Sequence, residues 1–91
     1  MDIAKVDSRN SPLDVMVGGK HYKGGIQPIE FYHANPQLNF QQCNVIKYIY
    51  RHKDKNGVQD LLKVIHYALI EAQFEYPEEL DDLKEKVRGL L

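Results

Sequence analysis

The sequence has a single cysteine, no tryptophan and no long apolar run. Cys43 cannot form a disulfide within the chain, which favours a reducing compartment. No stretch approaches the roughly 20 apolar residues of a membrane-spanning helix. The first residues also lack the basic and apolar segments of a secretory signal. We therefore expect a protein of the cytoplasm that does not contact a membrane.

Common metal and nucleotide motifs are missing as well. The four histidines contain no pair three or four residues apart, so we expect no metal site; they are His21, His33, His52 and His66. A Walker loop needs a hydroxyl residue after its lysine, whereas Lys20 is followed by His21. Cys43 shares a helix face with apolar residues and is expected to pack rather than to act as a nucleophile.

Charge is unevenly distributed, although the net charge is only −1. Residues 20–67 carry seven Lys/Arg against three Asp/Glu, whereas residues 68–91 carry three against seven. A nucleic-acid groove usually makes the whole domain basic, so we do not expect a nucleic-acid partner. The pattern favours a local anion site in the middle of the chain and a separate acidic C-terminal segment.

Apolar spacing and helix-capping residues predict a small all-α domain of about four helices. Pro28 suits the first turn of a short helix that ends before Pro36. Asn39 is a good N-cap for a helix over residues 40–52. Asn56, with Gln59 three residues later, is expected to cap the third helix through a capping box.

The rest of the chain divides around these helices. Residues 1–17 are expected to form a flexible arm with a short extended piece at 15–17, and residues 18–76 a nucleotide-binding helical domain that opens with a glycine-rich loop. After Pro77, an acidic helix is predicted over residues 77–91. Because so short a chain buries a small core, we also expect it to be a homo-oligomer.

Two polar stripes at helical spacing are the main functional signal. The first stripe consists of Asn44, Lys47, Tyr48 and Arg51, and the second of Asp60, Lys63 and Tyr67. In a helical hairpin the two stripes would meet around one cleft. Cations suit phosphate, an amide and a carboxylate suit a base or sugar, and aromatic rings suit stacking, so the stripes predict a nucleotide site.

Ordinary explanations exist for each of these features. A helix face with Lys and Arg is usually only solvated. Asp60 could pair with Lys63 or favour the start of its helix electrostatically. The glycine-rich segment with Lys20 and Lys23 could wrap a phosphate as a nest of amides, or could be a plain connector. The residues alone leave these alternatives open.

Two segments together resemble a known family. HYKGGIQPIEF (21–31) and NVIKYIYRHKDKNGVQDLLKVIHY (44–67) resemble the SaV-like nucleotide kinase family of tailed phages, and the resemblance covers about residues 19–74. It implies a helical oligomer that phosphorylates nucleoside monophosphates without a Walker loop in the bacterial cytoplasm. The matching positions are His21, Tyr22, Gln27, Pro28, Asn44, Lys47, Tyr48, Arg51, Lys55, Asp60, Lys63 and Tyr67.

The first functional hypothesis is therefore a nucleoside monophosphate kinase that uses Mg²⁺. The expected catalytic residues are His21, Arg51 and Asp60. The expected nucleotide-binding residues are Lys20, Tyr22, Lys23, Gln27, Asn44, Lys47, Tyr48, Lys55, Lys63 and Tyr67. Phosphoryl transfer depends mainly on charge neutralisation and positioning, which these cations would supply. On this hypothesis, replacing Arg51 with alanine abolishes turnover and leaves the fold intact.

Two other classes of function fit the same sequence. The chain could be a non-catalytic protein that sequesters a nucleotide, including a cyclic signalling nucleotide of bacterial anti-phage defence. It could also be an interaction module that inhibits a host enzyme through its acidic tail, residues 75–91. Formation of a nucleoside diphosphate separates the first hypothesis from the other two.

Overall fold

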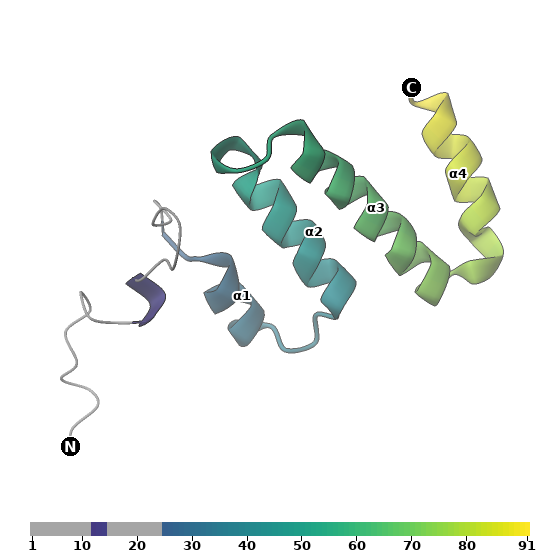
Figure 1. Ribbon diagram of the computed structural model, residues 1–91. Helices are drawn as coiled ribbons and strands as arrows, with labels where there is room; N and C mark the ends of the chain where they lie inside the picture. The colour runs from purple at the N-terminus through teal and green to yellow at the C-terminus, as the bar shows by residue number, and fades with distance from the viewer. Residues whose placement is uncertain (1–11, 15–24) are drawn as a thin grey trace, which may run out of the picture.

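Helices make up nearly all of the described chain (Figure 1). The computed structural model describes residues 12–14 and 25–91, among which no strand occurs. The α-helices are α1 (Pro28–Ala34), α2 (Phe40–Arg51), α3 (Val58–Glu75) and α4 (Leu80–Gly89). Short 3-10 helices span Pro12–Asp14, His52–Asp54 and Pro77–Glu79. The predicted all-α fold of about four helices is confirmed.

Much of the predicted N-terminal organisation lies outside the described residues. This applies to the extended piece at 15–17, to the glycine-rich loop up to residue 24, and to four predicted site residues, namely Lys20, His21, Tyr22 and Lys23. Within the predicted arm, the structure describes the 3-10 helix Pro12–Asp14. The Leu13 carbonyl in this helix accepts a hydrogen bond from Gln27 Nε2, which ties this turn to the start of α1.

The start of α2 agrees with the sequence prediction. Asn39 is the N-cap, and its side chain accepts a hydrogen bond of 2.8 Å from the Gln42 N–H. Gln42 Oε1 accepts in return from the Asn39 N–H at 2.9 Å, which completes a capping box. Asn39 Nδ2 also donates to Glu71 Oε1 on α3 at 2.9 Å. One residue therefore both begins α2 and joins it to α3.

The predicted cap of α3 is wrong by one residue. Gly57, and not Asn56, is the N-cap, with φ +58° and ψ −127°. No side chain caps the helix at Gly57; the Asp60 carboxylate instead holds the residue before the cap, because its Oδ2 accepts a hydrogen bond of 3.2 Å from the Asn56 N–H. Only glycine adopts such a backbone conformation without strain, and this allows the chain to turn sharply between α2 and α3.

We expect Gly57→Ala to destabilise the protein by about 1–3 kcal/mol, because alanine is strained at this φ and ψ. A Cβ at this position would meet no heavy atom within 4 Å, so the cost would be backbone strain alone. Urea denaturation measures the change. Gly89→Ala is the matched control, since Gly89 is helical and equally open, and it should be neutral or stabilising. An equal loss in both variants would contradict this account.

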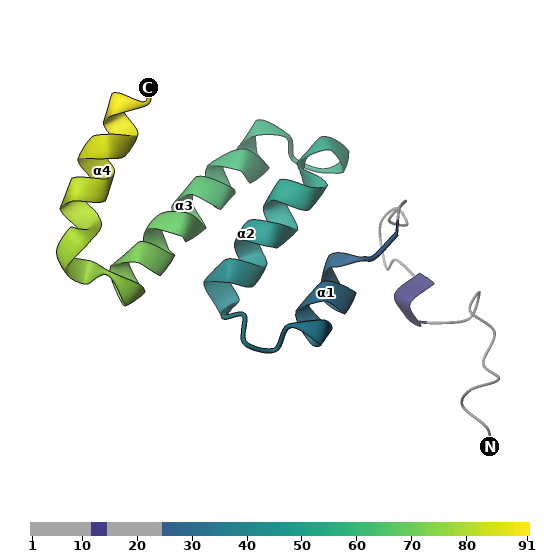
Figure 2. The ribbon, with the colours of Figure 1, turned by 180° about the vertical axis from the view of Figure 1, so that it is seen from behind.

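The helices are arranged in chain order, each beside its predecessor (Figures 1 and 2). α2 and α3 are antiparallel and pack along their length. α1 lies against α2, and the Tyr32 hydroxyl donates to the Cys43 carbonyl at 2.9 Å. α4 approaches α3 only near the 3-10 helix that joins them and then leans away. The α2–α3 hairpin is therefore the centre of the fold.

A single described chain has almost no apolar core. Among its described apolar residues, only Ala72 and Pro28 are buried. Large apolar side chains on α3 remain exposed, such as Leu62 at 63% and Ile65 at 51%. None of the described helices has the length and apolar character that a membrane crossing requires. The two most buried polar side chains, Asn44 and Asp60, belong to the predicted site.

Candidate functional site

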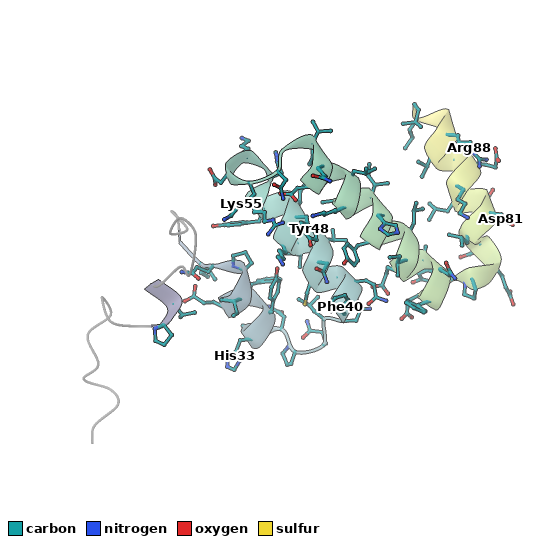
Figure 3. The ribbon with its side chains drawn as sticks, in the orientation of Figure 1. His33, Phe40, Tyr48, Lys55, Asp81 and Arg88 are labelled. Carbon is teal, nitrogen blue, oxygen red and sulfur yellow. The ribbon has the colours of Figure 1, made fainter. Side chains whose placement is uncertain are left out.

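The α2–α3 hairpin brings three cations to one tyrosine ring. Lys47 Nζ lies 5.3 Å from the ring centroid of Tyr48, Arg51 Cζ lies 4.6 Å from it, and Lys63 Nζ lies 4.9 Å from it. Each distance is within the range of a cation–π contact. Figure 3 labels Tyr48, which lies between α2 and α3. The two predicted stripes therefore meet, and we call Lys47, Tyr48, Arg51 and Lys63 the cation cluster.

Aromatic packing fixes the ring at the centre of this cluster. Tyr48 stacks on Tyr67 of α3 with centroids 5.9 Å apart and an interplanar angle of 14°. Phe40 meets Tyr67 edge-on, with centroids 6.1 Å apart. These contacts join the two helices across the hairpin. The predicted stacking residues Tyr48 and Tyr67 therefore stack on each other, and stacking of a base on Tyr48 stays a prediction.

A buried carboxylate holds the arginine of the cluster in place. Asp60 is fully buried, with 0% of its surface exposed. Arg51 Nε donates to Asp60 Oδ2 and Arg51 Nη2 donates to Oδ1, both at 3.3 Å. This fork matches the planar geometry of a carboxylate. The alternative that Asp60 has a structural pairing role gains support, with Arg51 rather than Lys63 as its closest partner.

Two further groups surround the Asp60 carboxylate. The Asn56 N–H donates to Oδ2, and Lys63 Nζ lies 3.9 Å from Oδ1. Burial alone would raise the pKa of Asp60, but hydrogen bonds from Arg51 and Asn56 and the nearby cations outweigh it and lower that pKa. Asp60 is therefore ionised at neutral pH. Arg51 and Lys63 share this carboxylate, and Lys47 adds a third positive charge beside Tyr48, so the cluster retains net positive charge.

We expect acid to weaken the fold through Asp60. Its folded pKa is lower than its unfolded pKa, so its contribution is complete above the unfolded value and is lost as the pH falls through the folded value. The melting temperature should stay nearly constant between about pH 5 and 7 and fall below about pH 4. Thermal denaturation followed by circular dichroism tests this. The melting temperature of an Asp60→Leu/Arg51→Met variant should fall less over the same pH range. An equal fall would show that protonation of Asp60 does not cause the loss of stability.

Other predicted residues lie apart from the cation cluster. Asn44 is buried, and its Nδ2 donates to the Phe40 carbonyl at 2.8 Å. Its side-chain amide is therefore hydrogen-bonded within α2. Gln27 is at the start of α1, where its N–H donates to Glu30 Oε2 at 2.7 Å. Lys55 lies exposed in the turn before α3. The structure thus unites Lys47, Tyr48, Arg51, Asp60, Lys63 and Tyr67 and leaves these three elsewhere.

The described cluster residues do not fit a protein-bound Mg²⁺ ion. Asp60 is the carboxylate nearest to the cations, and both of its oxygens already accept hydrogen bonds from Arg51. Mg²⁺ usually needs one or two free carboxylates in addition to phosphate oxygens. Across residues 12–14 and 25–91, no group of three or more His, Cys, Asp or Glu side chains could hold a metal. The described residues of the cluster therefore offer no free carboxylate to Mg²⁺.

The Arg51–Asp60 pair was not anticipated from the sequence. The two residues are nine positions apart on different helices, so neither periodicity nor i, i+4 spacing relates them. The sequence feature that could have predicted this pair is the place of the two residues in the hairpin. Each lies close to the turn between α2 and α3, where the end of one helix faces the start of the next. A hairpin brings such residues together.

A family model matches more than half of the chain. A model of a family described as proteins of unknown function, DUF3310, matches residues 11–69. The chain belongs to the DUF3310 family. The region that matches DUF3310 contains all the predicted site residues and ends within α3, so α4 lies outside it. No curated protein and no solved structure matches the chain.

Proposed function

We propose that this protein binds nucleotides through their phosphate groups, with the cation cluster as the phosphate site. The supporting observation is that Lys47, Arg51 and Lys63 converge on Tyr48 while, among the described residues, one carboxylate forms ion pairs with this cluster, and it is fully buried. Like charges held this close repel one another, and a bound anion relieves that repulsion. The two lysines lie at the surface of the hairpin, where a phosphate can reach them.

Each cation has a distinct part in this proposal. Lys47 and Lys63 are flexible point charges that neutralise phosphate oxygens. Arg51 is held by Asp60 through Nε and Nη2, so Nη1 remains to donate to a phosphate. Asp60 is then a positioning residue, because it fixes the guanidinium through the two-bond fork. Tyr48 keeps all three cations at one place on the hairpin.

The activity that we propose is phosphoryl transfer to a nucleoside monophosphate. Such a reaction needs positioned positive charge along the transferred phosphoryl group more than it needs covalent chemistry. The resemblance to phage nucleotide kinases supports this choice. It also assigns His21 and Tyr22 to the same site and the protein to the cytoplasm of an infected bacterium. Lys20 and Lys23, beside them in the glycine-rich segment, would add positive charge over the phosphates. Mg²⁺ would accompany the phosphate donor as part of the substrate.

A second candidate is nucleotide sequestration without catalysis. The state of Asp60 favours it, because this carboxylate is buried and saturated by Arg51 and Asn56. Asp60 is therefore not available to take a proton from an attacking group or to bind a metal. A cyclic signalling nucleotide needs only the cations and an aromatic surface. Catalysis would require groups beyond the cation cluster, such as His21.

One experiment separates the two candidates. The protein is incubated with a set of nucleoside monophosphates, ATP and Mg²⁺, and nucleoside diphosphate is measured by chromatography. Turnover that disappears in a His21→Ala variant supports the kinase. Micromolar binding of nucleotides by calorimetry without any diphosphate supports sequestration. Absence of both binding and turnover across mono-, tri- and cyclic nucleotides would refute the proposed phosphate site.

A further inference from the structure

One side of α3 carries an apolar stripe that the described part of the chain leaves open except at Ala72, which is buried. Leu62, Ile65, Leu69 and Ala72 follow each other at steps of three and four residues and so share a face. Asp60 and Tyr67, which contact α2, lie on another face of the same helix. A groove of about 430 Å³ runs along the stripe and is lined by Gln59, Leu62, Lys63, Ile65, His66 and Leu69.

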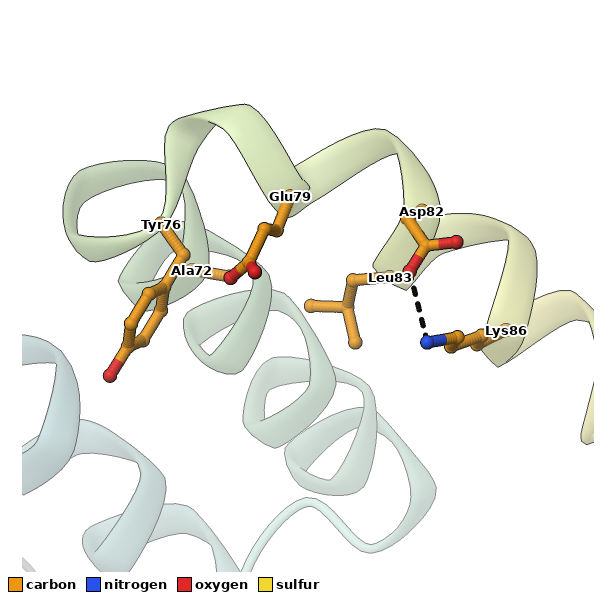
Figure 4. A pocket seen from close by; sticks show the side chains of 6 residues that line it. All are labelled: Ala72, Tyr76, Glu79, Asp82, Leu83 and Lys86. Atoms are coloured by element: carbon orange, nitrogen blue, oxygen red, sulfur yellow. Dashed lines mark ion pairs between the residues drawn. The ribbon is translucent and has the colours of Figure 1, made fainter.

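α4 carries a second apolar stripe that turns toward the first. Leu83 lines the junction with Ala72, where a groove of about 280 Å³ opens between α3 and α4 (Figure 4). Val87 and Leu90 lie four and seven residues after Leu83, on the same face. Because α4 leans away from α3 beyond this junction, the two stripes do not meet, and Leu90 stays 85% exposed. The two helices form an open V with apolar walls.

We propose that a second copy of this chain fills the V, with α4 of each copy seated between α3 and α4 of the other. The α3 and α4 helices of two chains would then form a four-helix bundle related by a two-fold axis. Such an isologous contact uses the same surface on both copies. It supplies the apolar core that one chain lacks, since only Ala72 and Pro28 among the described apolar residues are buried.

The charges near α4 favour a second copy over another partner. Acidic residues gather at its start, namely Glu78, Glu79, Asp81 and Asp82, and basic residues toward its end, namely Lys84, Lys86 and Arg88. A two-fold axis perpendicular to α4 places the two α4 helices antiparallel, so the acidic start of one lies beside the basic end of the other. The ion pairs within α4, Asp82–Lys86 and Glu85–Arg88, are solvent-exposed and can rearrange at little cost.

Substitution of a single residue in the V tests the proposal. Light scattering after gel filtration should give twice the 10.6 kDa mass of one chain for the wild type. Leu83→Glu should weaken self-association at least tenfold, because it places a charge in the apolar contact. Ile49→Glu is the matched control, since Ile49 is an exposed apolar residue on α2, outside the V. A monomeric wild type, or an assembly that Ile49→Glu disrupts and Leu83→Glu does not, overturns the proposal.

Exchanging charges on the surface of α4 tests the same interface without changing its apolar residues. Asp81→Lys/Asp82→Lys should weaken self-association about tenfold, because the basic end of one helix then meets another basic segment. Adding Lys84→Glu and Arg88→Glu restores opposite charges and should bring back most of the lost association. Circular dichroism verifies that each variant stays helical. Failure of the fourfold variant to regain association overturns the antiparallel arrangement of α4.

Discussion

Arg51→Ala is expected to lower the melting temperature by more than about 10 °C. The substitution leaves the Asp60 carboxylate fully buried without the arginine that holds both of its oxygens. A buried charge that has lost its partner destabilises a fold strongly. The effect should be large because a small domain has little stability to lose. Thermal unfolding by circular dichroism or calorimetry measures it.

This expectation replaces the one drawn from the sequence, in which Arg51→Ala spares the fold. The double variant Arg51→Met/Asp60→Leu provides the control, because it removes both charges and keeps apolar volume in their place. It should melt close to the wild type, since replacing a whole buried ion pair is often neutral. Arg51→Ala melting like the wild type, or the double variant melting lower than the single one, would show that the pair does not act as described.

Removing both lysines of the cation cluster is expected to weaken nucleotide affinity by at least 100-fold. Each charge-assisted contact to a phosphate typically contributes about 1.5–3 kcal/mol, and Lys47→Ala/Lys63→Ala removes two of them. The fold should persist, because Lys47 is exposed and Lys63 is only a distant partner of Asp60, 3.9 Å from Oδ1. Isothermal titration with a nucleoside triphosphate gives the affinities, and circular dichroism verifies the fold.

Lys84→Ala is the control for general electrostatic attraction. Lys84 is an exposed lysine on α4, away from the contacts of Tyr48. It should change the affinity by less than about twofold, as expected for a surface charge that is screened by salt. Comparable losses from Lys84→Ala and from the double lysine variant would mean that nucleotides bind to the overall charge of the surface. The cation cluster would then not be their site.

Local rules predicted the helices because they act within one or two turns. Pro28 begins α1 and Asn39 caps α2 as expected, since both effects involve backbone groups at most three residues away. The cap of α3 was misplaced for the same reason. Asn56 has the right side chain, but the chain needs a positive φ at Gly57 to turn from α2 into α3. The geometry of the whole hairpin therefore outweighed a local preference.

The candidate site, too, was predicted only as far as local residue spacing allows. The residue spacing placed Lys47, Tyr48 and Arg51 on one face of a helix, and Asp60, Lys63 and Tyr67 on one face of the next. Spacing cannot show that Asn44 is turned inward to the Phe40 carbonyl, or that Asp60 loses all contact with water. Both outcomes depend on how closely α2 and α3 approach each other. The residue spacing within one helix does not determine that distance.

The sequence by itself determined that this protein is helical, where its helices begin and end to within about three residues, and which of its cations are able to share a surface. The largest difference is at the last helix, predicted from residue 77, where a 3-10 helix over Pro77–Glu79 comes before α4. Only the tertiary structure decided that Arg51 pairs with a fully buried Asp60 while Lys47 and Lys63 keep access to solvent. The physical reason is that helix formation depends on neighbours along the chain. Desolvation and pairing of a charge depend on neighbours in space, which are fixed when α2 and α3 pack together.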